Sequence, residues 1–181
     1  MFFPTKDKGF FMNVSALEEY GLRCAARLAI LQDEETLSAP EIAESEGLSV
    51  EYVSKFMLHL KKAGLVRTVR GVNGGFALAR KPSEITLKDV FDALSGKKRV
   101  NDEFCKSFAG KSETCTRMDG CTIRPFWKVL SHYIEEFTKE MTLQDLVQSE
   151  QKTHSRTEEI AKRNVEQIRK LKLEMKEELQ S

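Results

Sequence analysis

Three of the four cysteines in the chain lie close together, in the stretch CKSFAGKSETCTRMDGC. Their spacing is Cys-x9-Cys-x5-Cys, which places Cys105, Cys115 and Cys121 among glycine, lysine and small polar residues. Structural zinc sites usually take cysteines in pairs separated by about two to four residues, and this stretch has no such pair. The spacing therefore indicates thiol chemistry in a loop rather than a zinc knuckle.

Long spacers between cysteines suit a larger cofactor. An iron–sulfur cluster spreads its ligand positions over several ångströms and is held by thiolates. Three cysteines leave one iron position open or filled by another group. The alternative is a metal-free set of reactive thiols that forms a reversible disulfide. Basic side chains near the cysteines would lower their pKa values and offset the charge of a cluster; they are Lys106, Lys111, Arg117 and Arg124.

Composition limits the class of protein. The 181 residues suffice for one or two small domains, and 40% apolar with 31% charged residues is typical of a soluble globular chain. No apolar run approaches the roughly 20 residues that span a bilayer, and the start of the chain is no convincing signal peptide. We expect a cytoplasmic protein with reduced thiols and no membrane partner. No nucleophile–base pair or phosphate-binding loop indicates an enzyme.

A helix over residues 15–31 is the first predicted element. Apolar residues recur in it at three- and four-residue spacing, and Ser15 with Glu18 completes a capping box at its start. Cys24, the fourth cysteine, lies on the apolar face of this helix. We expect Cys24 to be a buried core thiol.

Two short helices and a hairpin follow. Gly47 ends the first helix, and Ser49 caps the second, from about residue 50 to 63. Strands over residues 65–69 and 76–79 flank the turn RGVNGG, which is rich in residues that tolerate positive φ. A helix-turn-helix followed directly by a hairpin predicts a winged helix-turn-helix, a common DNA-binding module. The predicted fold class is mostly α with a small β-hairpin wing.

The second helix of such a module enters the major groove of DNA. Seven Lys/Arg side chains between residues 51 and 81 favour an anionic partner, although a solvated helix face would also account for them. A glycine-rich wing lets the backbone approach DNA, where Arg70 can enter a minor groove. Single modules bind weakly, so we expect a dimer on a two-fold operator. The predicted DNA-contacting residues, each with simple solvation as the alternative, are Ser49, Glu51, Tyr52, Ser54, Lys55, Lys62, Arg70, Asn73, Gly74 and Gly75.

The C-terminal part is predicted to be helical. A helix over residues 125–139 is too apolar to stand alone, so it packs on the winged domain, on a partner subunit, or on both. Thr142 can cap a short helix over residues 143–150. The charged tail fits a solvated helix or a weak coiled-coil contact in a dimer. We divide the chain into an N-terminal extension (1–13), a DNA-binding domain (14–96), a cysteine-containing loop (97–124), a dimerisation helix region (125–150) and a tail (151–181).

The segment from about residue 14 to 150 resembles the Rrf2 family of bacterial transcription regulators. The matching pieces are EEYGLRCAARLAIL, LSVEYVSKFMLHLKKAGLV, VRGVNGGFALAR, ITLKDVFDAL and the cysteine loop closed by CTIRPFW. The resemblance implies a homodimer with long crossed dimerisation helices. In members with three loop cysteines, it implies a [2Fe–2S] or [4Fe–4S] cluster and a role in iron–sulfur assembly, iron supply or the nitric oxide response.

The resemblance also implies a fourth ligand. Iron–sulfur assembly regulators of the family carry a histidine three residues after the last cysteine, where this chain has Arg124, which is no ordinary ligand. Nitric oxide and redox sensors instead use a carboxylate near the start of the first helix, from the other subunit, and the matching position is Glu19. A solvated Glu19, or one paired with Arg23, is the alternative, and His132 is a further candidate ligand.

The predicted function is a homodimeric transcription regulator that binds a double-stranded DNA operator. Its operator affinity would depend on an iron–sulfur cluster bound by Cys105, Cys115, Cys121 and Glu19. One alternative is a metal-free thiol switch that uses the same three cysteines. Another is a metabolic sensor that acts through a protein partner and does not bind DNA.

Overall fold

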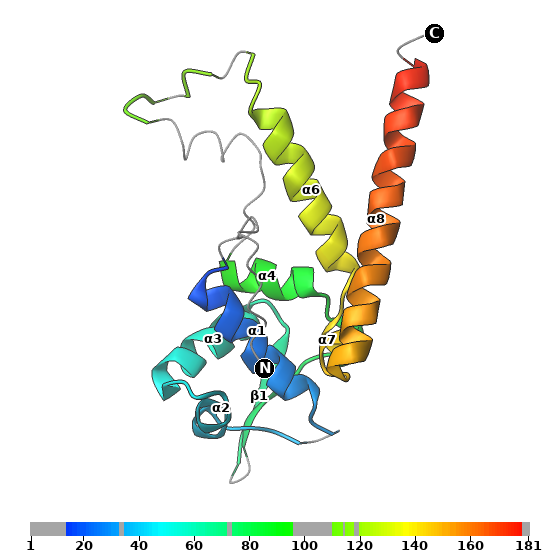
Figure 1. Cartoon of the computed structure of the whole chain (residues 1–181). Coiled ribbons are helices and arrows are strands. Elements are labelled where there is room, and N and C mark those ends of the chain that lie inside the picture. Colours follow the sequence, from blue (N-terminus) through cyan, green and yellow to red (C-terminus); the bar gives the residue numbers. More distant parts are fainter. Residues whose placement is uncertain are drawn as a thin grey trace, which may run out of the picture.

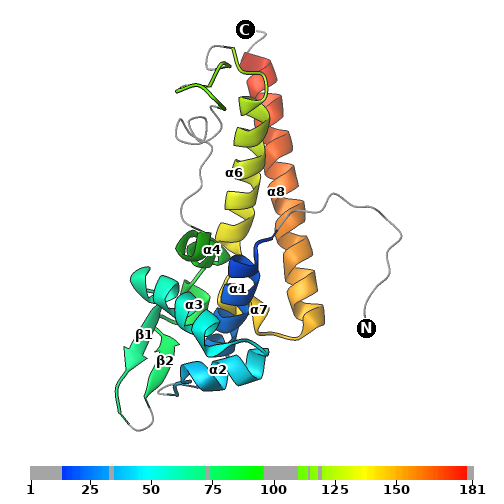
Figure 2. The same cartoon turned by 90° about the vertical axis from the view of Figure 1, so that its left-hand side faces the viewer.

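The computed structural model describes residues 14–32, 35–71, 74–95, 110–113, 115–117 and 120–178, with side chains up to Arg169. Short helices and a β-hairpin form a block at one end of the molecule, and two longer helices project from it (Figure 1). Figure 2 shows the same arrangement from the side, with the hairpin at the edge of the block. No helix in these ranges is long and apolar enough to cross a membrane.

Three helices begin the block. They are α1 (Ala16–Ala29), α2 (Ala39–Glu46) and α3 (Val50–Lys62). Each begins after a serine whose side chain accepts a backbone N–H bond, which satisfies one of the unpaired donors of a helix start. Gly47 ends α2 in the left-handed conformation, at φ 66°, and turns the chain into α3.

The hairpin consists of β1 (Val66–Val69) and β2 (Gly75–Leu78), paired antiparallel. A third segment pairs with β2, because Leu37 and Phe76 exchange two backbone hydrogen bonds of 3.1 and 2.8 Å. A Cβ atom on Gly75 would lie 2.5 Å from the carbonyl oxygen of Leu37, so only glycine permits this approach. The hairpin is therefore fixed to the residues that precede α2.

The remaining elements are η1 (Pro82–Glu84), α4 (Leu87–Ser95), α6 (Arg124–Glu140), α7 (Leu143–Leu146) and α8 (Glu150–Glu178). The chain between α6 and α7 returns to the start of α4. There Leu87 donates to the carbonyl of Met141 at 2.8 Å, and Leu143 donates to Ile85 at 2.9 Å. These bonds join the base of the long helices to the block of short helices.

One hydrophobic core joins these elements. From α3 it takes Val53, Phe56, Met57 and Leu60, the four residues on its inward face. Helices α1 and α4 close over them with Leu28 and Val90, among others. Ile160 of α8 is fully buried in the same core. The tail helix is therefore anchored at the base of the molecule.

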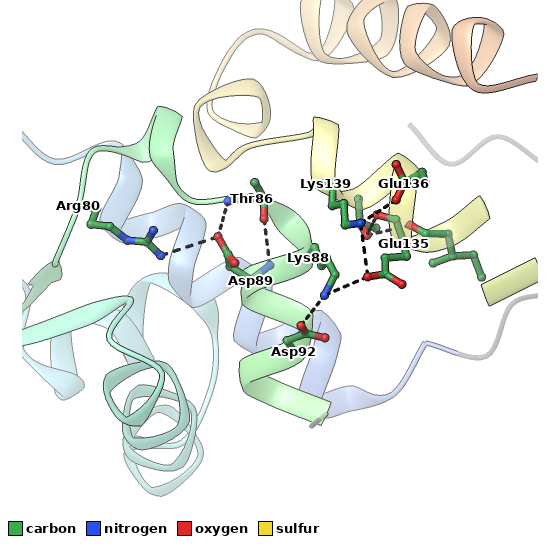
Figure 3. A network of polar contacts seen from close by, with 10 residues as sticks. Arg80, Thr86, Lys88, Asp89, Asp92, Glu135, Glu136 and Lys139 are labelled. Carbon is green, nitrogen blue, oxygen red and sulfur yellow. Dashed lines mark hydrogen bonds and ion pairs between the residues drawn. The ribbon is translucent and has the colours of Figure 1, made fainter. Parts of the chain in front are cut away.

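Polar contacts also join α4 to α6 (Figure 3). Lys88 lies 2.6 Å from Asp92 on its own helix and 3.6 Å from Glu135 on α6. At the start of α4, Thr86 and Asp89 form reciprocal side chain–backbone bonds, and Asp89 also lies 3.7 Å from Arg80 beyond the hairpin. Helix α4 thus has ion pairs on one side with α6 and on the other with the end of the wing.

The predicted fold class is confirmed as mostly helical with a two-stranded hairpin. The predicted helix over residues 143–150 is shorter than expected, since α7 ends at Leu146. The tail is one continuous helix of 29 residues. The extension 1–13 and the whole segment 96–109 lie outside the described residues.

Candidate DNA interface and cysteine site

Helix α3 presents one polar face to solvent. Because its four core residues are buried against α1, α2 and α4, the side chains on the opposite face are left exposed. The predicted contact residues Ser54, Lys55 and Lys62 all lie in this exposed set. A hydroxyl and two ammonium groups on an exposed helix can donate to base edges and phosphates of DNA.

The first turn of α3 carries three further predicted contacts, which also have local structural roles. Ser49 is the N-cap and accepts the N–H of Tyr52 at 3.3 Å. Hydrogen bonds from the backbone N–H of Glu51 and from Ser49 hold the pKa of the Glu51 carboxyl below its ordinary value. The ring of Tyr52 stacks on Phe56, with centroids 6.0 Å apart, yet remains 58% exposed. This turn is therefore ordered before any DNA is present.

The wing carries the other predicted contacts. Arg70 directly follows β1 and is exposed, and β1 packs against α3. Cβ atoms on Gly74 and Gly75 would lie within 2.6 Å of backbone carbonyl oxygens of Val69 and Leu37. The two glycines are thus required by the hairpin itself, and a role in approaching DNA remains a prediction. Asn73 lies outside the described residues.

One basic residue near this surface was absent from the predicted contacts. Arg67 lies in β1, opposite Ala77 of β2, and its side chain is exposed. The sequence feature that could have identified Arg67 as a DNA contact is the basic stretch between residues 51 and 81, to which it belongs. Strand pairing places Arg67 on the same hairpin as Arg70, so the basic surface extends along the wing.

The cysteine site is described at two of its three predicted positions. Cys115 and Cys121 are free thiols and are partly exposed, and Cys105 lies outside the described residues. Cys121 comes just before α6. The backbone N–H groups of Arg124 and Ile123 hold the pKa of the Cys121 thiol below its ordinary value. Unpaired N–H groups at a helix start stabilise a negative charge, so the start of α6 favours the thiolate form of Cys121.

Glu19 lies exposed on α1, near its start. The alternative partner, Arg23, instead donates to Glu46 at 2.9 Å. Within the described ranges, no three His, Cys, Asp or Glu side chains of one chain come close enough together to hold a metal. His132 is likewise exposed, on α6. The three predicted ligands that the structure describes, Cys115, Cys121 and Glu19, are therefore not brought together within this single chain, and the common role of the four remains a prediction.

Cys24 has a different environment. Its side chain is fully buried in the core, as the sequence predicted. Burial, together with the negative charge of Glu46, raises the pKa of the Cys24 thiol to about 11. A neutral buried thiol is a poor nucleophile and a poor metal ligand, so Cys24 belongs to the packing of α1.

Residues 14–149 match the family model Rrf2, described as an iron-dependent transcriptional regulator. The chain belongs to the Rrf2 family. The HTH-type transcriptional regulator IscR of Serratia proteamaculans is 30% identical over 139 residues, which are 77% of this chain and 81% of that protein. The family match covers the helical block, the hairpin and α6, and it ends just before α8.

Two solved structures resemble this Rrf2 protein. The T. potens IscR structure has a TM-score of 0.60 and 31% identity, over 75% of this chain and 86% of that one. The structure of CymR, described as the global cysteine regulator of B. subtilis, has a TM-score of 0.60 and 27% identity, over 76% of this chain and 97% of that one. This protein is therefore a DNA-binding transcription regulator of the Rrf2 type and not an enzyme.

Proposed function

We propose that this Rrf2 regulator is a cytoplasmic homodimer whose affinity for a double-stranded operator is controlled by an iron–sulfur cluster on the three-cysteine loop. The observation that carries the proposal is the environment of Cys121. Its thiolate is stabilised by backbone N–H groups at the start of α6, the helix expected at the dimer interface. A change at this thiolate would therefore act directly on α6.

The donor set suits the proposed group. Iron–sulfur clusters are held by thiolates, and Cys115 and Cys121 are both free, partly exposed thiols. Cys105 would supply the third thiolate, and Glu19 of the second subunit the fourth ligand. A bound cluster, of the [2Fe–2S] or [4Fe–4S] type, would supply a centre that responds to oxidants, nitric oxide or iron shortage.

The exposed surface of α6 supports a homodimer. Phe126 and Val129 are 59% and 63% exposed, and Ile123 and Trp127 lie beside them, also exposed. A contiguous apolar patch of this kind on a helix usually marks a protein–protein contact. In the proposed dimer, this face of α6 packs against a second copy, which also brings a second recognition helix to the operator.

The described contacts give the cysteine segment a route to the recognition helix. Cys121 adjoins α6, and Glu135 of α6 pairs with Lys88 of α4 at 3.6 Å. Helix α4 packs on α3 within the common core. A movement of α6 would therefore displace α4, against which α3 packs, and so change the orientation of α3. In this way the cysteine site would alter DNA affinity.

A metal-free thiol switch is the second candidate function. The specific observation in its favour is again Cys121, because a stabilised thiolate attacks oxidants and disulfides readily at neutral pH. The similarity to CymR, named as a cysteine regulator, points the same way. In this case Cys121 would form a reversible disulfide with Cys105 or Cys115.

Anaerobic purification separates the two candidates. The visible spectrum, iron and acid-labile sulfide would be measured on the same sample, with DNA binding before and after cluster loss. We expect a brown protein with matched iron and sulfide, and a shift in operator affinity on cluster loss. A protein that stays colourless after reconstitution, but forms a reversible disulfide, would identify the thiol switch.

Two variants test the proposed ligands. Cys121→Ser should abolish cluster binding, whereas Cys24→Ala, which removes the buried thiol, should leave the spectrum unchanged. Glu19→Ala should alter the spectrum or speed cluster loss. If Glu19→Ala leaves both the spectrum and operator binding intact, Glu19 is an ordinary surface carboxylate and another group fills the fourth position.

A further inference from the structure

Glu46 binds two arginines at once. One carboxylate oxygen accepts the Nε–H of Arg23 and the other accepts the Nε–H of Arg27, each at 2.9 Å. The Glu46 side chain is only 10% exposed, while the two arginines are 41% and 35% exposed. Two charge-assisted bonds to one largely buried carboxylate fix its position more firmly than a single surface ion pair does.

We call the contact of Glu46 with Arg23 and Arg27 the clamp. It is important because of the position of Glu46 in the fold. Glu46 is the last residue of α2 and directly precedes Gly47, which turns the chain into α3. Arg23 also donates to the backbone carbonyl of Glu46, at 2.8 Å. Because α2 has no basic residue in its own last turn, α1 supplies the positive charge that the C-terminal end of α2 favours.

The two arginines lie on one side of α1, because they are four residues apart. The Arg23 guanidinium lies over the ring of Tyr20, 5.6 Å from its centroid, in a cation–π contact. Glu19, the proposed cluster ligand, precedes Arg23 by a further four residues. Glu19 therefore lies on the same face of α1 as Arg23 and Arg27, which contact the turn between α2 and α3.

We propose that Glu46 is a positioning residue for operator binding, which holds the turn before the recognition helix against α1. With the clamp intact, α3 keeps one orientation relative to α1 and to the wing. Without it, the helix-turn-helix would still form, but α3 would no longer meet base edges at a fixed angle. The link onward to Glu19 rests on the proposed function, whereas the effect of Glu46 on DNA binding does not.

The test compares Glu46→Gln with Glu44→Gln in the full-length, metal-free protein. Glu44 is exposed on the same helix, so each variant loses one negative charge beside the same turn and only one of them loses the clamp. The probe is a duplex that the wild-type protein selects from a randomised pool, beside a shuffled duplex of the same composition. Both affinities would be measured over a range of salt concentrations.

We expect Glu46→Gln to weaken binding to the selected duplex about tenfold, with little change for the shuffled duplex or in the salt dependence, because phosphate contacts survive a tilt of α3 better than base contacts do. Adding Arg27→Gln to Glu46→Gln should cause little further loss, since the two residues act through one interaction. If Glu46→Gln does not fold, Arg27→Gln alone removes one arm of the clamp and should show a smaller loss of the same kind.

Equal affinity of the Glu46→Gln and Glu44→Gln variants for the selected duplex would overturn the proposal. An equal loss of selected and shuffled binding by Glu46→Gln, together with a lower melting temperature, would also overturn it, because that pattern marks general destabilisation. All proteins are compared without metal. A missing cluster would therefore defeat the proposed function and leave the outcome of this test unaffected.

Discussion

Lys88 of α4 and Glu135 of α6 form an ion pair of 3.6 Å between the DNA-binding block and the first long helix (Figure 3). Lys88 is also 2.6 Å from Asp92, and its side chain is only 17% exposed. One ammonium group therefore sits between two carboxylates from different helices. This arrangement adds one partly buried charge to the backbone bonds and apolar contacts at the junction of α4 and α6.

Lys88→Met should destabilise this junction. Methionine keeps most of the length of the side chain but removes the ammonium group between Asp92 and Glu135, while Glu135 keeps its pair with Lys139 within α6. We expect a loss of about 1–2 kcal/mol in the free energy of unfolding, because this pair is less exposed than most surface ion pairs. Urea unfolding followed by circular dichroism measures the change.

Lys139→Met provides the control for this prediction. Lys139 lies 3.5 Å from the same Glu135 and 2.7 Å from Glu136, but it is 45% exposed and stays within α6. Its loss should cost clearly less stability than the loss of Lys88, because exposed pairs within a helix contribute little. Equal destabilisation by the two variants would show that the link between helices has no special weight.

Local signals in the sequence predicted most of the fold. The capping box of Ser15 and Glu18 and the cap at Ser49 are formed as expected, since both depend only on residues three apart. The four buried residues of α3 also follow from helical spacing. Pairing between distant segments was not predictable. Leu37 pairs with β2 through backbone hydrogen bonds, which no pattern of side chains in the sequence predicts.

The candidate site was harder to predict from the sequence than the fold. Helical spacing offered Arg23 as one alternative partner for Glu19, four residues away, but the structure pairs Arg23 with Glu46, 23 residues along the chain. Tertiary packing decides such partners, because an exposed pair within a helix contributes only about 0.3–0.5 kcal/mol. A fourth ligand from a second subunit, as proposed for Glu19, would present the same difficulty, because the sequence of one chain does not show contacts between subunits.

Gly75→Ala should open the contact between the wing and the segment before α2. An added Cβ atom would lie 2.5 Å from the backbone oxygen of Leu37, and a backbone atom cannot turn aside as a side chain can. The Phe76 N–H, which donates to that oxygen, should exchange with solvent about tenfold faster or more, because its local opening becomes easier. Amide hydrogen exchange measures this directly.

Gly64→Ala is a suitable comparison for Gly75→Ala. Gly64 has a φ of 72° and nothing within 4 Å of a Cβ atom, so alanine there brings backbone strain but no close contact. It should lower overall stability by about 1 kcal/mol without a selective effect at Phe76. If the Phe76 amide responds alike in both variants, the close approach of Leu37 is not what requires glycine at position 75.

The predicted DNA contacts divide into two kinds, which mutation can separate. Arg70→Ala should weaken operator binding about tenfold through loss of a charged wing contact. Lys55→Ala should change base preference more than the salt dependence, because Lys55 lies in the first half of α3. Lys62→Ala, at the end of α3, should instead reduce the slope of log affinity against log salt by about 1.

Binding to selected and shuffled duplexes at several salt concentrations measures these effects. Glu150→Gln, at the start of α8 and outside the family match, is a control that should change neither property. A Lys55→Ala protein that keeps its base preference would place base readout elsewhere on α3. An unchanged affinity in Arg70→Ala would remove the wing from the DNA interface.

The cysteines should differ sharply in reactivity. Hydrogen bonds from the backbone N–H groups of Arg124 and Ile123 lower the pKa of Cys121, so its thiolate fraction at pH 7 exceeds that of an ordinary cysteine. Burial raises the pKa of Cys24 to about 11, and the thiol is also inaccessible. Its thiolate fraction at pH 7 is therefore only about one in ten thousand. In metal-free protein, iodoacetamide should modify Cys121 first and leave Cys24 unmodified.

Peptide mass spectrometry at increasing pH measures both reactions. The rate at Cys121 should reach half its maximum below the pH at which an ordinary thiol does, because the folded protein favours the charged form. Cys24 should react only after unfolding in urea, where the backbone bonds and the burial are both lost and the two thiols should become equally reactive. Rapid modification of Cys24 in the folded protein would mean that α1 opens to solvent. An ordinary pH profile at Cys121 would mean that the start of α6 does not stabilise its thiolate, and the proposed cysteine site would lose the observation that carries it.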